Sequence, residues 1–275
     1  MTSLRVALVQ LRTQATQAAS LAQAEPLIRQ AAADGAELVV TPEGSNLLQR
    51  NREALQTVMR PLADDGFVNG VRALAAELKV RILIGSALVK RDQDEGCANR
   101  AVAVGPDGAI EATYDKIHMF DVDLPTGERH RESSLYVPGD RAVTTETPAG
   151  KLGLTICYDL RFPHLYRRLA QAGAVAIAVP AAFTRPTGEA HWETLLRARA
   201  IETGAYILAA AQGGTHEDGR ATWGRSTIVA PWGEIVGKLD HDAPGVLIAD
   251  LDIDAVGKAR AAIPNLLNGR EFLGP

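Results

Sequence analysis

The sequence predicts an α/β fold, because short apolar runs alternate with helical patterns along most of its 275 residues. No serine- or glycine-rich linker divides the chain, and no short-period repeat is present. A single domain covering residues 1–275 is therefore expected, a length that large α/β domains reach. Strands are expected at residues 4–10, 37–41, 81–87, 98–104, 109–114, 151–157, 174–179, 205–211, 226–230, 234–237 and 245–250, and helices at residues 15–33, 66–78, 161–172 and 189–203.

The individual elements follow from local pattern. The chain enters a strand-like run almost at its first residue, and the β-branched run at 38–41 stops at Pro42. The apolar run 152–156 reads as a short buried strand that a helical stretch follows. In the last predicted helix, Trp192, Leu195, Leu196 and Arg199 share one face, and Gly204 is placed to end the helix.

Composition excludes several classes of protein. Hydrophobic residues make up 46% and charged residues 23% of the chain, as in ordinary folded proteins. The net charge of −4 and the absence of a dense basic stretch argue against nucleic-acid binding. No signal-peptide pattern and no apolar run of membrane-spanning length occur, so neither secretion nor a membrane partner is expected. The two cysteines fit a reducing cytoplasm if Cys157 is a free nucleophile, and Cys97 reads as a structural thiol.

Three charged or nucleophilic side chains follow strand-like runs. Cys157 ends the run 151–157 before a predicted helix, whose amide groups would favour a thiolate. Glu43 follows Pro42 at the end of the second predicted strand, and Lys116 follows the strand at 109–114. A thiol nucleophile needs a base and a group that holds an oxyanion, and Glu43 and Lys116 offer these. Taken alone, each would more often be a loop charge or a small core residue.

These residues resemble the Glu-Lys-Cys triad of the nitrilase superfamily, the carbon–nitrogen hydrolases, and the resemblance extends from Val6 to Phe272. It is most specific at residues 114–121, 131–133, 157–163 and 190–202, and within the superfamily the chain is most similar to the Nit branch. The resemblance implies a four-layer αββα sandwich, and a homodimer or larger homo-oligomer paired through helices.

The resemblance also implies roles. Cys157 would attack an amide carbonyl, Glu43 would carry the proton, and Lys116 with the backbone N–H of Tyr158 would hold the oxyanion. A second glutamate near the lysine, expected at Glu132 rather than Glu128, would raise the pKa of Glu43. Asp159 and Arg161 would orient the turn of the nucleophile, and His118 reads as a hydrogen-bonded structural histidine. The candidate substrate-pocket residues are Arg131, Phe183, Thr184, Thr187 and His191.

The substrate class follows from the resemblance to the Nit branch. It implies an amidase that converts deaminated glutathione to 2-oxoglutarate and cysteinylglycine. An omega-amidase releasing ammonia from α-ketoglutaramate, and a non-catalytic binding or scaffold protein, remain as alternatives. The substrate carboxylate needs a cation, for which Arg129, Arg131, Arg161 and Arg185 are candidates, with one of the first two favoured because they lie beside Glu132. The small polar residues Gly44-Ser45-Asn46 depart from many relatives, which carry a bulkier apolar residue after the glutamate.

Other chemistries receive little support. The six histidines show no HxH or HExxH spacing, and no CxxC pair, GxGxxG or GxxxxGK[ST] motif is present. Neither a metal nor a nucleotide cofactor is therefore expected. A cysteine–histidine hydrolase ranks low, because no histidine has a position comparable with those of Glu43 and Lys116. Nitrile hydrolysis, carbamoyl hydrolysis and acyl transfer occur on the same scaffold, and the triad does not exclude them.

Overall fold

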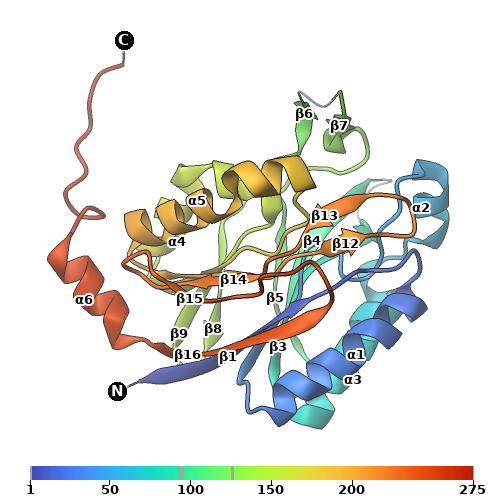
Figure 1. Cartoon of the computed structure of the whole chain (residues 1–275), viewed down its shortest axis with the longest axis horizontal. Coiled ribbons are helices and arrows are strands. Elements are labelled where there is room, and N and C mark those ends of the chain that lie inside the picture. Colours follow the sequence, from blue (N-terminus) through green and yellow to red (C-terminus); the bar gives the residue numbers. More distant parts are fainter. Residues whose placement is uncertain (1, 93–95, 125–126, 275) are drawn as a thin grey trace.

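The computed structural model describes residues 2–92, 96–124 and 127–274 and contains two six-stranded sheets (Figure 1). The sheets pack face to face, with α1 and α3 on the outer face of the first and α4 and α5 on the outer face of the second. The expected αββα sandwich is confirmed. No helix within these described ranges is long and apolar enough to cross a membrane.

The first sheet has the order β16-β1-β2-β3-β4-β5, in which β1, β2 and β3 are parallel and the outer pairs are antiparallel. Its strands alternate between two cores, since successive side chains point to opposite faces. Val6 and Leu8 of β1 face the second sheet, whereas Ala7 and Val9 face α1 and α3. The strands are β1 (Ser3–Gln10), β2 (Leu38–Val40), β3 (Arg81–Lys90), β4 (Cys97–Val104), β5 (Ile110–Asp115) and β16 (Gly245–Asp252).

The second sheet has the order β15-β14-β11-β10-β9-β8, and β9, β10 and β11 form its parallel centre. Leu152 and Leu154 of β9 are buried between the two sheets, whereas Ile177 of β10 pairs with Gly153 on the face that packs against α4. The strands are β8 (Val143–Thr147), β9 (Gly150–Leu154), β10 (Ala174–Ala178), β11 (Tyr206–Ala209), β14 (Thr227–Val229) and β15 (Ile235–Lys238).

The helices begin and end at residues suited to those places. Thr16 caps α1 and Asp65 caps α3 through side-chain oxygens that accept backbone N–H groups, and Gly204 ends α5 in the left-handed region with a φ of 55°. Trp192, Leu196 and Arg199 are buried on the predicted face of α5. The helices are α1 (Gln17–Ala33), α2 (Arg52–Val58), α3 (Gly66–Leu78), α4 (Pro163–Gln171), α5 (Arg185–Thr203) and α6 (Asp254–Ala262).

Several short elements were not predicted, because their sequences are too short or too polar to show a period. They include α2, α6, β8 and the ribbons β6 (Asp121–Asp123) with β7 (Arg129–Arg131) and β12 (Gly213–Thr215) with β13 (Ala221–Trp223). Three predicted bounds were wrong by three residues or more, and one of them is the end of β3, which lies at Lys90 rather than at residue 87. Helix α5 begins at Arg185 rather than residue 189, with Pro186 in its first turn. Strand β9 ends at Leu154, three residues before Cys157.

The two sheets approach each other closely at Gly85 of β3. A Cβ atom added there would lie 1.9 Å from the carbonyl oxygen of Thr41 and 2.4 Å from Cβ of Pro180. Thr41 follows β2 of the first sheet, and Pro180 follows β10 of the second, so only glycine permits this contact. The carboxyl ends of strands from both sheets therefore meet at one seam, where Glu43, Lys116 and Cys157 lie.

Candidate active site

Glu43 lies on a buried loop that the residues after it hold in place. Gly44 has a φ of 62°, and its N–H donates to Oγ of Ser86 at 2.8 Å. Oγ of Ser45 donates to the carbonyl oxygen of Pro42 at 2.7 Å, and Nδ2 of Asn46 donates to the carbonyl oxygen of Leu88 at 3.0 Å. The small polar residues that depart from many relatives therefore fix the backbone that presents Glu43.

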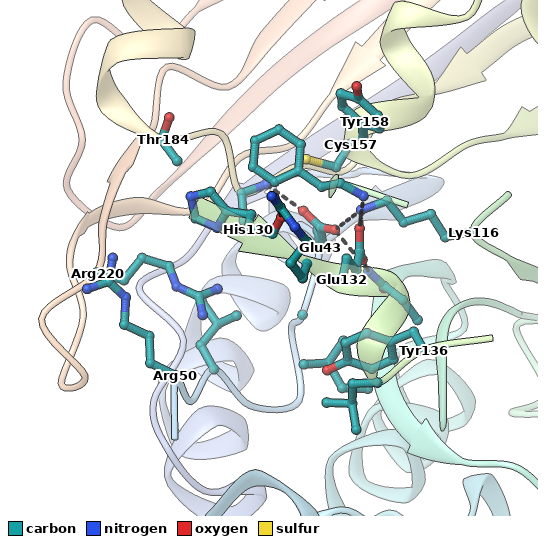
Figure 2. Close-up of a pocket in the computed structure, with 18 of the residues that line it drawn as sticks. Glu43, Arg50, Lys116, His130, Glu132, Tyr136, Cys157, Tyr158, Thr184 and Arg220 are labelled. Carbon is teal, nitrogen blue, oxygen red and sulfur yellow. Dashed lines mark hydrogen bonds and ion pairs between the residues drawn. The ribbon is translucent and has the colours of Figure 1, made fainter. Parts of the chain in front are cut away.

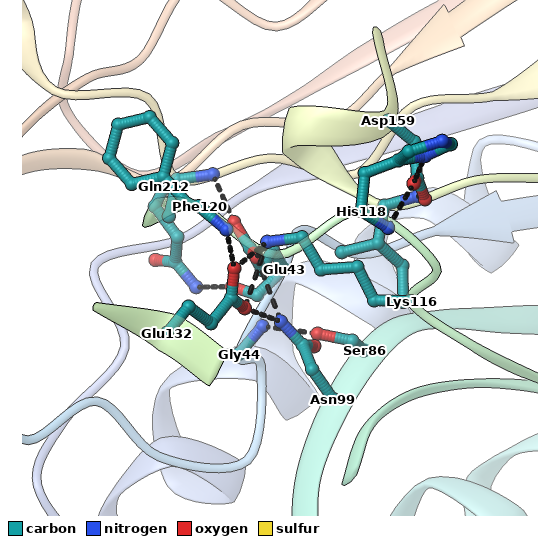
Figure 3. Close-up of polar contacts among 12 residues, drawn as sticks. Glu43, Gly44, Ser86, Asn99, Lys116, His118, Phe120, Glu132, Asp159 and Gln212 are labelled. Carbon is teal, nitrogen blue, oxygen red and sulfur yellow. Dashed lines mark hydrogen bonds and ion pairs between the residues drawn. The ribbon is translucent and has the colours of Figure 1, made fainter. Parts of the chain in front are cut away.

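Lys116 joins two carboxylates (Figure 3). It follows β5, and its Nζ donates to Oε1 of Glu43 at 3.0 Å and to Oε2 and Oε1 of Glu132 at 2.7 and 2.9 Å. The Lys116 side chain is only 2% exposed. A buried lysine needs such partners, because an unpaired charge away from water is strongly disfavoured.

Glu132 is the second carboxylate of this cluster. It opens a short 3-10 turn (Glu132–Ser134) after β7, and its Oε2 accepts the N–H of Phe120 at 2.6 Å. Glu128 instead lies near the solvent, with its Oε2 3.6 Å from Nε2 of His130. The structure thus places Glu132 beside Lys116, and Glu128 outside that cluster.

Asn99 was missed by the sequence analysis. Its Nδ2 donates to Oε1 of Glu43 at 2.9 Å and to Oε1 of Glu132 at 3.1 Å, so it separates two carboxylates that would otherwise repel (Figure 3). The signal was a polar side chain inside the apolar run 98–104, since a buried amide needs hydrogen-bond partners.

Cys157 opens a five-residue 3-10 turn (Cys157–Arg161) rather than the first turn of an α-helix. Its φ of 49° is unusual for a non-glycine residue, and its N–H donates to the carbonyl oxygen of Pro180 at 2.8 Å. The Cys157 thiol and the Glu43 carboxylate both line the cavity described below and lie close enough for each to shift the pKa of the other. The N–H of Ala182 donates to Oε2 of Glu43 at 2.9 Å and so fixes the carboxylate beside the sulfur.

Asp159 holds the turn of the nucleophile from the inside. Its fully buried carboxylate accepts the N–H of Ile156 at 2.9 Å and the hydroxyl of Tyr114 at 2.6 Å. Nδ1 of His118 lies 2.6 Å from Oδ1 of Asp159, and the His118 ring stacks on Phe162. These contacts agree with the structural part expected for Asp159 and His118.

Glu43 and Lys116 hold each other in the charged state. Burial alone would raise the pKa of Glu43, but the charge of Lys116 and hydrogen bonds from Cys157, Lys116 and Asn99 lower it below its usual value. Burial alone would lower the pKa of Lys116, but the charges of Glu132 and Glu43 raise it well above its usual value. The expectation that the pKa of Glu43 is raised was therefore wrong, because the charge of Lys116 and the hydrogen bonds together outweigh the effect of burial.

The thiol is neutral in the free protein. Burial, and then the negative charge of Glu43, raise the pKa of Cys157 well above its usual value, against a smaller opposite effect of Lys116. The expectation that helix amides favour a thiolate was wrong, since five residues of 3-10 turn intervene before α4 begins at Pro163. A neutral thiol hydrogen-bonded to an ionised carboxylate can lose its proton to that carboxylate while it attacks an electrophile.

A cavity of about 590 Å³ opens onto this cluster (Figure 2). Its size suits a small organic substrate. The predicted residues that line it are Glu43, Lys116, Glu132, Cys157, Tyr158, Arg131, Phe183, Thr184 and Thr187. His191 is not among the lining residues; it is exposed on α5 and lies 3.2 Å from Arg161. The placement of His191 in the pocket was wrong, because α5 begins earlier than predicted.

Comparison with known proteins identifies the family. The model of the carbon–nitrogen hydrolase family matches residues 5–261. The chain belongs to the carbon–nitrogen hydrolases. It is 41% identical over 272 residues to a Yersinia enterocolitica protein named deaminated glutathione amidase, with 98% of this chain and 94% of that protein covered. The membership confirms the expected class of hydrolase, which acts on carbon–nitrogen bonds other than peptide bonds.

Two solved structures resemble this hydrolase closely. The NitFhit protein of C. elegans superposes with a TM-score of 0.89 at 32% identity, over 98% of this chain and 65% of that longer one. Saccharomyces cerevisiae Nit3, described as a member of branch 10 of the nitrilase superfamily, gives a TM-score of 0.85 at 28% identity, over 95% of this chain and 94% of that one. The resemblance to the Nit branch is thereby confirmed.

The four arginines predicted to bind the substrate carboxylate differ in whether a carboxylate of this hydrolase already pairs with them. Arg131 donates to both carboxylate oxygens of Asp123 at 2.9 Å, and Arg129 also lies against Asp123. Arg185 pairs with Asp242 and does not line the cavity. Arg161 lines the cavity, lies over the rings of Phe183 and Tyr158 and has no carboxylate partner among the described residues. The two favoured arginines are thus already paired, and of the four predicted candidates Arg161 is the one that lines the cavity without a carboxylate partner among the described residues.

Proposed function

We propose that this protein is an amidase that converts deaminated glutathione to 2-oxoglutarate and cysteinylglycine through a thioester on Cys157, with residues 1–275 acting as one hydrolase unit. The observation that carries the proposal is the presence of Cys157 and Glu43 side by side in the cavity lining, with Nζ of Lys116 bonded to both Glu43 and Glu132. This arrangement supplies a nucleophile, a base and a cation together. The substrate is taken from the name of the Yersinia enterocolitica relative.

In the first half-reaction, Sγ of Cys157 attacks the amide carbonyl carbon as Glu43 takes the thiol proton. The carbonyl oxygen becomes negative and is stabilised by Nζ of Lys116 and the N–H of Tyr158. Glu43 then passes its proton to the leaving nitrogen, the C–N bond breaks, and cysteinylglycine departs. The acyl group remains as a thioester.

In the second half-reaction, Glu43 takes a proton from a water that attacks the thioester carbon. The C–S bond breaks, the sulfur recovers the proton from Glu43, and 2-oxoglutarate leaves. One carboxylate thus serves as base and acid in both halves. The lowered pKa of Glu43 keeps it ionised at neutral pH, ready to accept the first proton.

Omega-amidase activity is the second candidate, because α-ketoglutaramate would form the same acyl thioester and would offer the same carboxylate to Arg161. The two substrates differ in their leaving groups. Purified protein should be given each in turn, with 2-oxoglutarate and ammonia measured separately. Faster release of 2-oxoglutarate from deaminated glutathione than of ammonia from α-ketoglutaramate supports the proposal. The reverse order favours the omega-amidase, and no release from either substrate rejects both activities.

Lys116→Ala is expected to lower kcat by at least about 10²-fold, the usual cost of losing one oxyanion donor. Losing the cation should also raise the pKa of Glu43, so the acidic limb of the kcat/KM profile moves to higher pH. Lys116→Arg should not restore activity, since a wide planar guanidinium does not fit between carboxylates 2.7–3.0 Å from Nζ. Near-normal kcat in Lys116→Ala, with circular dichroism as a control for folding, would contradict this role.

Glu132→Gln is expected to cause a partial loss of activity and to move both limbs of the pH profile downward. Without Glu132, Lys116 pairs with Glu43 alone, and the pKa of Glu43 falls further. Activity depends on ionised Glu43, so the acidic limb moves to lower pH. The pKa of Lys116 also falls, because Glu132 is the largest of the charges that raise it, so the alkaline limb moves down as well.

Glu128→Gln is the matched control for this experiment. Glu128 also lines the cavity, but its carboxylate is 43% exposed and contacts His130 rather than Lys116. It should leave both limbs in place. If Glu132→Gln behaves like Glu128→Gln, Glu132 has no part in setting the protonation of the site.

Arg161→Gln is expected to raise KM more than it lowers kcat, because a substrate carboxylate is bound alike in the ground and transition states. The change should affect deaminated glutathione and α-ketoglutaramate equally, since both present this carboxylate on the acyl side. Arg131→Gln is the comparison, because its guanidinium is already bonded to Asp123. A larger KM effect for Arg131→Gln than for Arg161→Gln would reverse the assignment.

We also propose a cytoplasmic homodimer or larger homo-oligomer. Cys157 is not in a disulfide, and a nucleophilic thiol is preserved in a reducing compartment. Ile201 on α5 is exposed and lies against Gly233, next to the exposed Trp232. These apolar side chains support self-association through the α5 layer, which sedimentation of wild-type protein and Ile201→Glu would test.

A further inference from the structure

Three basic side chains gather on one side of the cavity, across from the catalytic cluster (Figure 2). Arg50 comes from the loop before α2, Arg220 from the turn between β12 and β13, and His130 from β7. All three line the cavity, and none of them was singled out from the sequence. Three separate segments thus bring two guanidinium charges and one imidazole to one place.

The charges of this group are only weakly compensated. Arg50 has no carboxylate partner among the described residues, and Nη2 of Arg220 lies 3.7 Å from Oδ2 of Asp218. A charge-assisted hydrogen bond is about 2.7–2.9 Å long, so that pair does not use the donors of Arg220 fully. Burial lowers the pKa of His130, and the positive charges of Arg220 and Arg50 lower it further against the opposite effect of Glu128. The two guanidinium groups are therefore near enough to act on one imidazole, and an anion between them would relieve their repulsion.

The shape of the proposed substrate, on which this inference rests, gives this charge a use. Deaminated glutathione carries one carboxylate at its acyl end and a second at the end of the cysteinylglycine leaving group. In an extended dipeptide, that second carboxylate lies ~7 Å beyond the scissile nitrogen. Arg161 lies beside Tyr158 and Phe183, and the proposed function assigns it to the carboxylate at the acyl end. Arg50 and Arg220 on the opposite side of the cavity are then available for the carboxylate of the cysteinylglycine half.

We propose that Arg50 and Arg220 form a subsite for the carboxylate of the amine half of the substrate. They would favour amides whose leaving group ends in a carboxylate over primary amides that release ammonia. His130 contributes a further donor at the edge of this subsite. The pair would thus determine which of the two candidate activities predominates.

The experiment compares substrates with and without the second carboxylate. Arg50→Gln, Arg220→Gln and the double variant are assayed with deaminated glutathione, with its C-terminal amide and with α-ketoglutaramate. The double variant should lose about 10- to 100-fold in kcat/KM for deaminated glutathione, mostly through KM, since bonds to charged groups are lost. Its activity toward the amidated form and α-ketoglutaramate should stay within about twofold of wild type, because no charge pair is removed. Arg141→Gln is the matched control, since Arg141 is 86% exposed and lies outside the cavity.

Equal losses for all three substrates, or no loss for any, would overturn the subsite. A second measurement separates this failure from that of the proposed function. Cys157→Ala protein is titrated calorimetrically with cysteinylglycine and with cysteinylglycinamide. The subsite is supported if Cys157→Ala protein binds cysteinylglycine more tightly than cysteinylglycinamide and if this preference is lost when Arg50 and Arg220 are also replaced. This result would hold even if wild type does not hydrolyse deaminated glutathione. If Cys157→Ala protein with both arginines intact binds cysteinylglycine and cysteinylglycinamide equally tightly, the subsite is rejected.

Discussion

Cys157→Ala is expected to abolish turnover while the protein keeps its fold. The loss should be roughly 10⁴- to 10⁶-fold in kcat, as for other enzymes that lose their nucleophile. The fold should persist because, although Cys157 belongs to the main core cluster, it also lies at the surface of the cavity and its backbone N–H is held by Pro180. Steady-state assays with circular dichroism and thermal unfolding would check both parts of this prediction.

Cys97→Ala is the matched control for Cys157→Ala. Cys97 is also a buried cysteine, but it lies in a separate cluster with Leu47, Met59 and Tyr136 and does not line the cavity. Its replacement should cost some stability and leave kcat near normal. Iodoacetamide should modify Cys157 faster than Cys97, since only the former is reached from the cavity. Equal labelling of both, with activity retained, would reject Cys157 as the nucleophile.

Glu43→Gln is expected to be almost as damaging. Glutamine can keep the hydrogen bonds from Asn99 and Ala182, but it cannot accept the thiol proton or return it to the leaving nitrogen. Both half-reactions therefore lose their proton carrier, and kcat should fall by roughly 10⁴-fold. The protein should remain folded, because the amide is isosteric with the carboxylate.

The Glu43→Gln variant also makes a prediction about the thiol. The negative charge of Glu43 raises the pKa of Cys157, so its removal should lower that pKa. Ultraviolet titration of the thiolate would detect the shift, with Cys157→Ala as the blank. A thiol pKa that stays in place, or a kcat within about tenfold of wild type, would show that Glu43 is not the base.

The sequence predicted the layers well because they depend on periodic patterns. The runs at 4–10 and 98–104 and the face formed by Trp192, Leu196 and Arg199 were recognisable, since burial selects side chains at a fixed spacing. Strand β8, with the sequence Val-Thr-Thr-Glu-Thr, gave no such signal, because it is a polar strand at the edge of its sheet.

The pKa values of the site residues and the grouping of its charges could not be predicted from the sequence. Glu43, Lys116 and Cys157 were found from their positions after strands, and Glu132 from the resemblance. Their pKa values depend on burial and on contacts between segments far apart in the chain, such as Asn99 with both glutamates. The basic group formed by Arg50 and Arg220 arises in the same way, from two loops about 170 positions apart in sequence whose convergence no local pattern reveals.

The seam at Gly85 links the activity of this protein to its folding. Glu43 and Lys116 follow strands of one sheet and Cys157 follows a strand of the other, so neither sheet contains a complete site. During refolding, each sheet could form its hydrogen bonds and the far-ultraviolet dichroism could recover while no substrate is turned over. Enzyme activity then appears only when the two halves dock, which makes catalysis itself the probe for the last assembly step of this fold.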